Sequence, residues 1–249
     1  MFTPEDRARV RASLLEFAAL DKRITGTAIT GSAAEGREDQ WSDIDLAFGL
    51  AAAADPAELL RDWTAHVYER HDALHHLDVI AGPWTYRVFL LPETLQVDLA
   101  FVAETEFRAL APTFRLVSGT ANEARYPSPA PAESVIGMAW LYALHARSSI
   151  ARGKLWQAEY MISGMRDHAL ALACLRHGLP AAHGRGIDGL PAEVTAAFED
   201  CLVGRLEGEE LRRAFLAVTL ELIREMRHAD PELAGRLKAA LRELSDPKK

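Results

Sequence analysis

Two aspartates one residue apart constrain this chain more than any other feature. Asp43 and Asp45 open an apolar run that continues to Leu50, and this run follows a Gly31-Ser32 turn that closes an earlier β-branched run. In an extended strand, residues i and i+2 point to the same face. The two carboxylates are therefore expected to point toward one spot at the start of a strand.

The N-terminal half of the chain alternates between helical and β-rich patterns. The patterns predict helices over 3–22, 33–38 and 55–70, strands over 24–30, 42–50, 77–81, 85–91 and 95–102, and a hairpin turn at 92–94. The strand over 42–50 is nearly all apolar after Asp45, as expected for a central strand covered on both faces. In the strand over 95–102, Asp98 interrupts apolar residues and is expected to point to the face opposite theirs.

A proline-rich segment divides the chain. Residues 126–131 read Tyr-Pro-Ser-Pro-Ala-Pro, and prolines at alternate positions favour an extended linker. Downstream, the patterns predict helices over 133–151, 154–177, 191–203, 208–228 and 231–244. We therefore predict an α+β protein with a mixed-sheet domain over 1–120, a linker over 121–132, and a helical bundle over 133–249 that binds the acceptor.

Composition and charge narrow the function classes. The net charge is −8, from 36 acidic and 28 basic residues, which disfavours nucleic acid as a partner and suits a cationic small molecule better. No apolar run approaches the roughly 18 residues of a membrane span. The N-terminus lacks the apolar core of a secretory signal, so we expect a cytoplasmic protein. Cys174 and Cys201 lie in apolar helical pattern and are expected to be buried thiols.

Three carboxylates together indicate a metal site. Mg²⁺ prefers hard oxygen ligands, and substrate phosphates and water complete its octahedron. Asp98 is informative because burying an unpaired carboxylate costs several kcal/mol. A buried ion pair with arginine would explain Asp98 alone, but it would leave the Asp43–Asp45 pair and the Gly31-Ser32 turn unexplained.

The spacing of these residues resembles that of the nucleotidyltransferase superfamily that includes polymerase beta. The resemblance is carried by a Gly-Ser turn, a Ser-Asp-x-Asp run and a lone Asp in a later strand, and it covers residues 24–102. With the helical second domain, the chain looks like the aminoglycoside and lincosamide nucleotidyltransferases. Relatives often carry Arg immediately before the glycine that aligns with Gly36, where this chain has Glu35, and Arg37 is the candidate to replace that charge.

The resemblance implies a role for each motif position. Asp43, Asp45 and Asp98 would hold two Mg²⁺ ions roughly 3.5 to 4 Å apart, which stabilise the attacking and leaving oxygens of an in-line displacement. Gly31, Ser32 and Ser42 would bind the nucleotide, with ATP as the expected co-substrate. Arg37 and Lys154, which lie outside the motif, are further candidates for binding it. Asp98 is also a candidate general base.

The second domain offers one further catalytic candidate. Glu159 lies on a polar helical stripe with Trp156. It could act as base or acceptor ligand, with Trp156 stacking on a ring and Arg152 or Lys154 reaching phosphates. The alternative is that this stripe is a solvated face with local ion pairs.

We expect an enzyme that moves a nucleoside monophosphate, AMP from ATP, onto a hydroxyl of a small molecule and releases pyrophosphate. An aminoglycoside or lincosamide antibiotic is the leading hypothesis for the acceptor, and the protein is expected to be a monomer or a homodimer. One alternative is a protein AMP-transferase of toxin–antitoxin type. Another is a non-catalytic module of the same fold that binds nucleotide or a partner.

Overall fold

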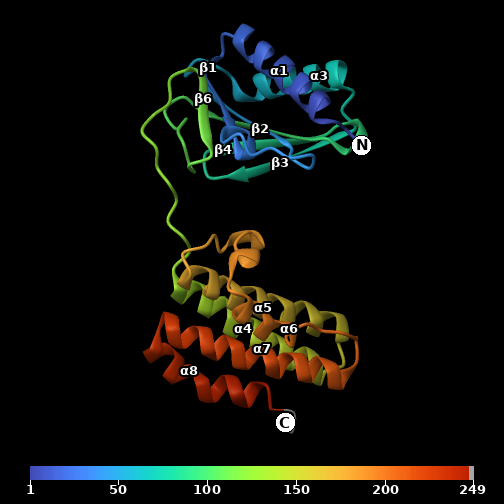
Figure 1. Ribbon diagram of the computed structural model, residues 1–249, viewed down its shortest axis with the longest axis vertical. Helices are drawn as coiled ribbons and strands as arrows, with labels where there is room; N and C mark the ends of the chain where they lie inside the picture. The colour runs from blue at the N-terminus through green and yellow to red at the C-terminus, as the bar shows by residue number, and fades with distance from the viewer. Residues whose placement is uncertain (247–249) are drawn as a thin grey trace. The chain divides into compact units, whose positions relative to one another are not determined.

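The computed structural model describes residues 1–246 and divides the chain into two compact units, Met1–Pro127 and Ser128–Lys249. Each unit has its own hydrophobic core. The first contains a sheet and helices, while the second is helical, which confirms the predicted α+β class (Figure 1). None of the helices formed by residues 1–246 combines the length and the apolar content of a membrane span.

The first unit is built on a six-stranded mixed sheet in the order β3-β4-β5-β2-β1-β6. Its strands are β1 (Ile24–Thr30), β2 (Ile44–Leu50), β3 (His75–Ala81), β4 (Trp84–Leu90), β5 (Gln96–Ala103) and β6 (Phe114–Gly119). β2 and β5 pair in parallel at the centre, and the other neighbours are antiparallel. The acidic motif therefore begins a central strand, as the apolar run predicted.

Two helices, α1 (Pro4–Leu20) and α3 (Pro56–His71), cover one face of this sheet (Figure 1). Thr3 caps α1 in a reciprocal pair with Asp6, and Asp55 caps α3. The fully buried Trp63 of α3 contacts Phe48 and Phe101 of the two parallel strands. This packing holds one face of β2 and β5 against the helices. Their other face takes part in a separate, smaller core.

Small residues line the opposite face of the sheet. Ala28, Ala47 and Ala100 lie there, with Trp84 and Phe107 packed around them in a smaller core. Because side chains alternate along a strand, this is also the face of Asp45 and Asp98.

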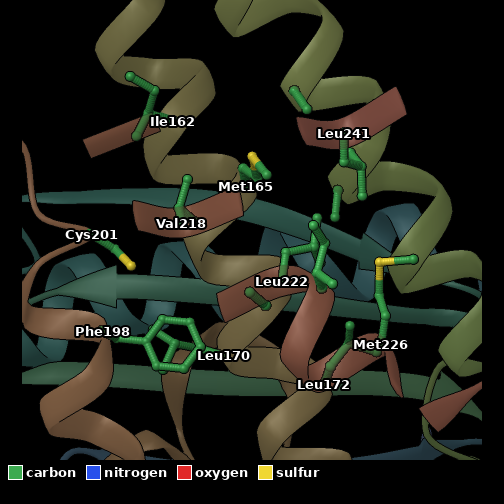
Figure 2. Packing of buried hydrophobic residues seen from close by; sticks show 14 of the residues in the cluster. Ile162, Met165, Leu170, Leu172, Phe198, Cys201, Val218, Leu222, Met226 and Leu241 are labelled. Carbon is green, nitrogen blue, oxygen red and sulfur yellow. The ribbon is translucent and has the colours of Figure 1, made fainter. Parts of the chain in front are cut away.

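The second unit is a bundle of helices with an alanine-rich core. Its α-helices are α4 (Ala132–Ala151), α5 (Leu155–Arg176), α6 (Ala192–Glu199), α7 (Gly208–Ala229) and α8 (Pro231–Leu244), and two short turns are η2 (Ala182–Gly184) and η3 (Ile187–Gly189). Figure 2 shows side chains such as Met165, Leu222 and Met226 meeting between them. Cys174 and Cys201 are buried free thiols, as predicted, and burial raises the pKa of Cys201 to about 12.

Two local predictions differ from the structure, and the predicted hairpin is confirmed. The short helix predicted over 33–38 is α2 (Gly31–Ala34), because Gly31 starts it directly after the strand and Gly36 adopts a positive φ of 67° just beyond its end. No strand was predicted between 103 and 120, where the structure has the strand β6. The turn at 92–94 joins the antiparallel strands β4 and β5 as predicted, and it forms the 3₁₀ segment η1 (Pro92–Thr94), in which Glu93 and Thr94 have positive φ.

Candidate metal and nucleotide site

The three aspartates meet on one face of the sheet. Asp43 immediately precedes β2, Asp45 lies within it, and Asp98 lies in β5. The parallel register makes Asp45 and Asp98 direct partners, so their side chains emerge side by side. One ligand oxygen from each of the three carboxylates lies within 4.8 Å of the others, and all three side chains are half-buried. Within residues 1–246 this is the grouping of acidic and metal-ligating side chains that could hold an ion.

The electrostatics of this cluster suit a cation. Burial raises the pKa of Asp98, the neighbouring Asp43 carboxylate raises it further, and a hydrogen bond from Gln96 opposes the rise. Negative charge is therefore concentrated at this spot, and hard oxygen donors are the set that Mg²⁺ takes from proteins. The residues present thus fit a divalent cation.

Gln96 is a site residue that sequence reasoning missed. Its Nε2 donates to Asp98 Oδ1 at 3.0 Å and approaches Asp43 Oδ2 at 3.5 Å. The signal was available, because Gln96 is two residues from Asp98 in the same strand and shares its face. Gln96 therefore bridges two of the carboxylates and orients that of Asp98.

Gly31 leaves room for the Asp45 carboxylate. Its φ is 63°, a left-handed conformation that glycine adopts at little cost, and a Cβ at this position would overlap Asp45 Oδ2. From the sequence, Gly31 was predicted to help bind the nucleotide, because a residue without a side chain lets the backbone approach the phosphates. The structure adds a second reason, which is that any side chain would displace a carboxylate of the cluster.

The loop before Asp43 is held by a buried arginine from α1. Arg7 is only 4% exposed, and its Nη1 donates to the carbonyl oxygens of Asp39 at 2.6 Å and Ser42 at 3.0 Å. Its Nε lies 2.9 Å from Glu38, which also pairs with Arg11. Sequence reasoning did not find Arg7, because its partners lie more than thirty residues away and the helical pattern marks it only as one charge among several.

Three residues predicted to bind nucleotide lie near the cluster in sequence and differ in their surroundings. Ser32 is the second residue of α2. The Ser42 hydroxyl donates to Asp39 Oδ1 at 3.1 Å and accepts from the Asp39 backbone N–H at 2.9 Å, so it closes the loop. Arg37 is largely exposed and pairs with Glu35, which compensates the glutamate charge locally.

Two further predicted residues, Lys154 and Glu159, belong to the helical unit. Lys154 is exposed immediately before α5. Glu159 is half-buried and accepts a hydrogen bond of 2.6 Å from Ser163 one turn along the same helix. Trp156, the aromatic member of the stripe, is 76% exposed. The contacts of Glu159 are thus local to α5.

Comparison with known proteins gives structural likenesses and no sequence match. No protein-family model and no curated protein matches the chain. Among solved structures, the crystal structure of an aminoglycoside 6-adenyltransferase from Bacillus subtilis is similar, with a TM-score of 0.44 and 10% sequence identity, over 99% of this chain and 100% of that chain.

Proposed function

We propose that this protein is a Mg²⁺-dependent nucleotidyltransferase that moves AMP from ATP to a hydroxyl of a small molecule. One observation carries the proposal, namely the convergence of Asp43, Asp45 and Asp98 from two parallel strands with ligand oxygens within 4.8 Å of one another. The alternative that Asp98 forms a buried ion pair with an arginine is not supported, because the groups that shift its pKa are Gln96 and Asp43.

The three carboxylates hold the cations in this proposal. When bound, Mg²⁺ would neutralise charge on the triphosphate and on the leaving group. Gly31 and Ser32, at the start of α2, would approach the phosphates, and Gln96 keeps the Asp98 carboxylate directed into the cluster. Arg37, Ser42 and Lys154 stay predictions as nucleotide contacts. Glu159 stays a prediction as base or acceptor ligand, and its hydrogen bond from Ser163 favours the alternative of a solvated helix face.

In the reaction, the acceptor oxygen forms a bond to the α-phosphorus while the bond from that phosphorus to the bridging oxygen of pyrophosphate breaks. The acceptor proton passes to a carboxylate oxygen of Asp98, and pyrophosphate leaves with its electron pair.

Calorimetric titration with α,β-methylene-ATP, with and without Mg²⁺, tests the proposal. Binding should require the metal and should be lost in Asp45→Asn. Asp72→Asn is the matched control, because Asp72 is exposed, belongs to the same unit and has a positive φ that asparagine accepts. Nucleotide binding that does not depend on Mg²⁺, or that survives in Asp45→Asn, would show that the carboxylates do not form the site.

A second assay addresses transfer itself. The protein is incubated with labelled ATP or GTP and a panel of aminoglycosides, lincosamides and protein extracts, and mass spectrometry searches for an adduct one nucleotide heavier. A modified protein would favour the AMP-transferase of toxin–antitoxin type. Metal-dependent binding with no adduct in any arm would favour a nucleotide-binding module.

A further inference from the structure

A cavity of about 140 Å³ opens on the sheet face that carries the carboxylates. Its floor includes Ala47 of β2 and Ala100 of β5, and its walls include Trp84, Tyr86 and Phe114. All of its lining residues belong to the first unit. The cavity lies on the face of the sheet opposite α1 and α3.

The floor of the cavity lies on the same strands and the same face as the carboxylate cluster. Ala47 and Ala100 are register partners, as are Asp45 and Asp98 two residues earlier on the same strands. Two residues along a strand span about 6.6 Å, and side chains two apart share a face. A ligand in the cavity would therefore lie about one ring's length from the metal site.

The cavity spans the central strands, with Trp84 and Tyr86 on the Asp98 side and Thr30 of β1 and Phe114 of β6 on the other side. In the sheet, β4 lies beside β5 and β1 lies beside β2, so these outer strands flank the central pair on opposite sides. The α2 segment with Gly31 follows β1, whereas the aromatic wall of Trp84 and Tyr86 belongs to β4. Tyr86 is the register partner of Ala100, diagonal to Asp98. The group that loses a proton to Asp98 would thus have the aromatic wall beside it.

The lining is aromatic and carries no negative charge. Trp84 is 5% exposed and stacks near Tyr86 with ring centroids 6.0 Å apart. Among the residues that line the cavity, Arg108 is the charged side chain, and its Nη2 donates to the Thr105 carbonyl oxygen at 2.8 Å. An ammonium group placed in the cavity itself would lose water beside a guanidinium and find no carboxylate among the lining residues, which is unfavourable.

We propose that this cavity receives one ring of the acceptor, and that the acceptor is an uncharged alcohol with a flat or apolar ring rather than a polyamine sugar. The proposal rests on the proposed function, because it assigns the acceptor of that reaction. The cavity, at about 140 Å³, is large enough for one ring but not for a complete drug-sized ligand, whose pockets measure about 300–1,000 Å³. Aromatic walls favour a ring by offset or edge contacts.

Fluorine NMR of the full chain labelled with 5-fluorotryptophan tests this proposal. The Trp84 resonance is assigned by its loss in Trp84→Phe, and the protein is titrated with 2-phenylethanol and, separately, with kanamycin. The Trp84 resonance should shift with 2-phenylethanol and stay in place with kanamycin. A shift with kanamycin at lower concentration than with 2-phenylethanol would overturn the proposed acceptor chemistry.

Filling the cavity provides the matched comparison. Ala100→Leu should weaken binding of 2-phenylethanol by about tenfold or more, because the added atoms occupy the ring's volume. Ala103→Leu places the same change at an exposed position at the end of the same strand and should leave the titration unchanged. If Ala100→Leu does not fold, Tyr86→Ala, which removes an aromatic wall, replaces it. Equal probe affinity in the parent and in the folded cavity variant would overturn the proposal.

The two proposals fail in different ways. Mg²⁺-dependent binding of α,β-methylene-ATP without any Trp84 shift by 2-phenylethanol would overturn the cavity proposal and leave the proposed function intact. A Trp84 shift by 2-phenylethanol without metal-dependent nucleotide binding would overturn the proposed function, and with it the acceptor assignment. A Trp84 shift caused by Mg²⁺ and the nucleotide analogue alone would assign the cavity to the nucleobase and overturn the acceptor proposal.

Discussion

Asp98 in the first unit and Glu159 in the second present the same functional group in opposite settings. Asp98 meets Asp43 and Asp45 from another strand, and burial raises its pKa. Glu159 accepts a hydrogen bond from Ser163 on its own helix. The pKa and the metal-binding capacity of Asp98 depend on residues that the fold brings from distant segments. The hydrogen bond of Glu159 is made within one helical turn and needs no such tertiary contact.

The largest expected effect is loss of the central carboxylates. Asp45→Asn should lower nucleotidyl transfer by about 10³-fold, because it removes several kcal/mol of charge stabilisation at about 1.4 kcal/mol per factor of ten. Initial rates of AMP transfer, measured on the acceptor found by the adduct assay, check this expectation. Asp72→Asn should keep the parent rate.

Asp98→Asn separates function from stability. Because its pKa is raised, Asp98 holds its proton more tightly in the folded protein than in the unfolded chain. Asp98 therefore contributes to the stability of the fold below its ordinary pKa of 3.8, and this contribution is lost as the pH rises through the raised value. At pH 7 without metal, Asp98→Asn should therefore raise Tm, while the rise in Tm that Mg²⁺ produces in the parent should disappear. If Asp98→Asn had a lower Tm than the parent in EDTA, the ionised Asp98 side chain would not be unfavourable in the metal-free fold.

Removing Arg7 should weaken the loop that presents Asp43. Arg7→Met should lower the free energy of unfolding of the first unit by about 3–5 kcal/mol, because Glu38 and two carbonyl oxygens lose a buried cation. Urea unfolding measures this loss, and Arg9→Met is the control, since Arg9 lies on the same helix with its side chain 74% exposed. Equal stability of the two variants would mean that Arg7 does not hold the loop.

Gly31 and Gly36 form a second matched pair. Both have positive φ, but a Cβ meets nothing within 4 Å at Gly36 and overlaps Asp45 at Gly31. Gly36→Ala should cost about 1–2 kcal/mol of stability from backbone strain alone. Gly31→Ala should cost more and should also weaken Mg²⁺-dependent nucleotide binding by about tenfold or more, measured by calorimetry. Unchanged nucleotide affinity in Gly31→Ala would separate the turn from the carboxylate cluster.

The smallest effect is expected in the helical unit. Glu159→Gln should change the transfer rate by less than about threefold, because the amide oxygen can still accept from Ser163 and surface changes of this kind are usually small. Initial rates test the expectation. A loss approaching that of Asp45→Asn would instead make Glu159 the base or an acceptor ligand.

Much of the fold was predictable because its signals are local. The apolar run after Asp45 predicted a central strand, and the proline-rich segment preceded a region whose helices follow the apolar periodicity. β6 was not predicted, since its side chains are mostly exposed and its partner β1 lies about ninety residues earlier. An edge strand of that kind has no apolar alternation from which it could be recognised.

By itself, the sequence determined which residue types stand at the motif positions and that Asp43 and Asp45 share a face, because strand geometry imposes that alternation on any chain. Only the tertiary structure decided that Asp98 is the register partner of Asp45, that Arg7 holds the loop before Asp43, and that a cavity lies on the same sheet face as the cluster. Those relations join segments tens of residues apart. Their physical cause is the packing of one strand on another and of α1 on the sheet, which no local pattern records.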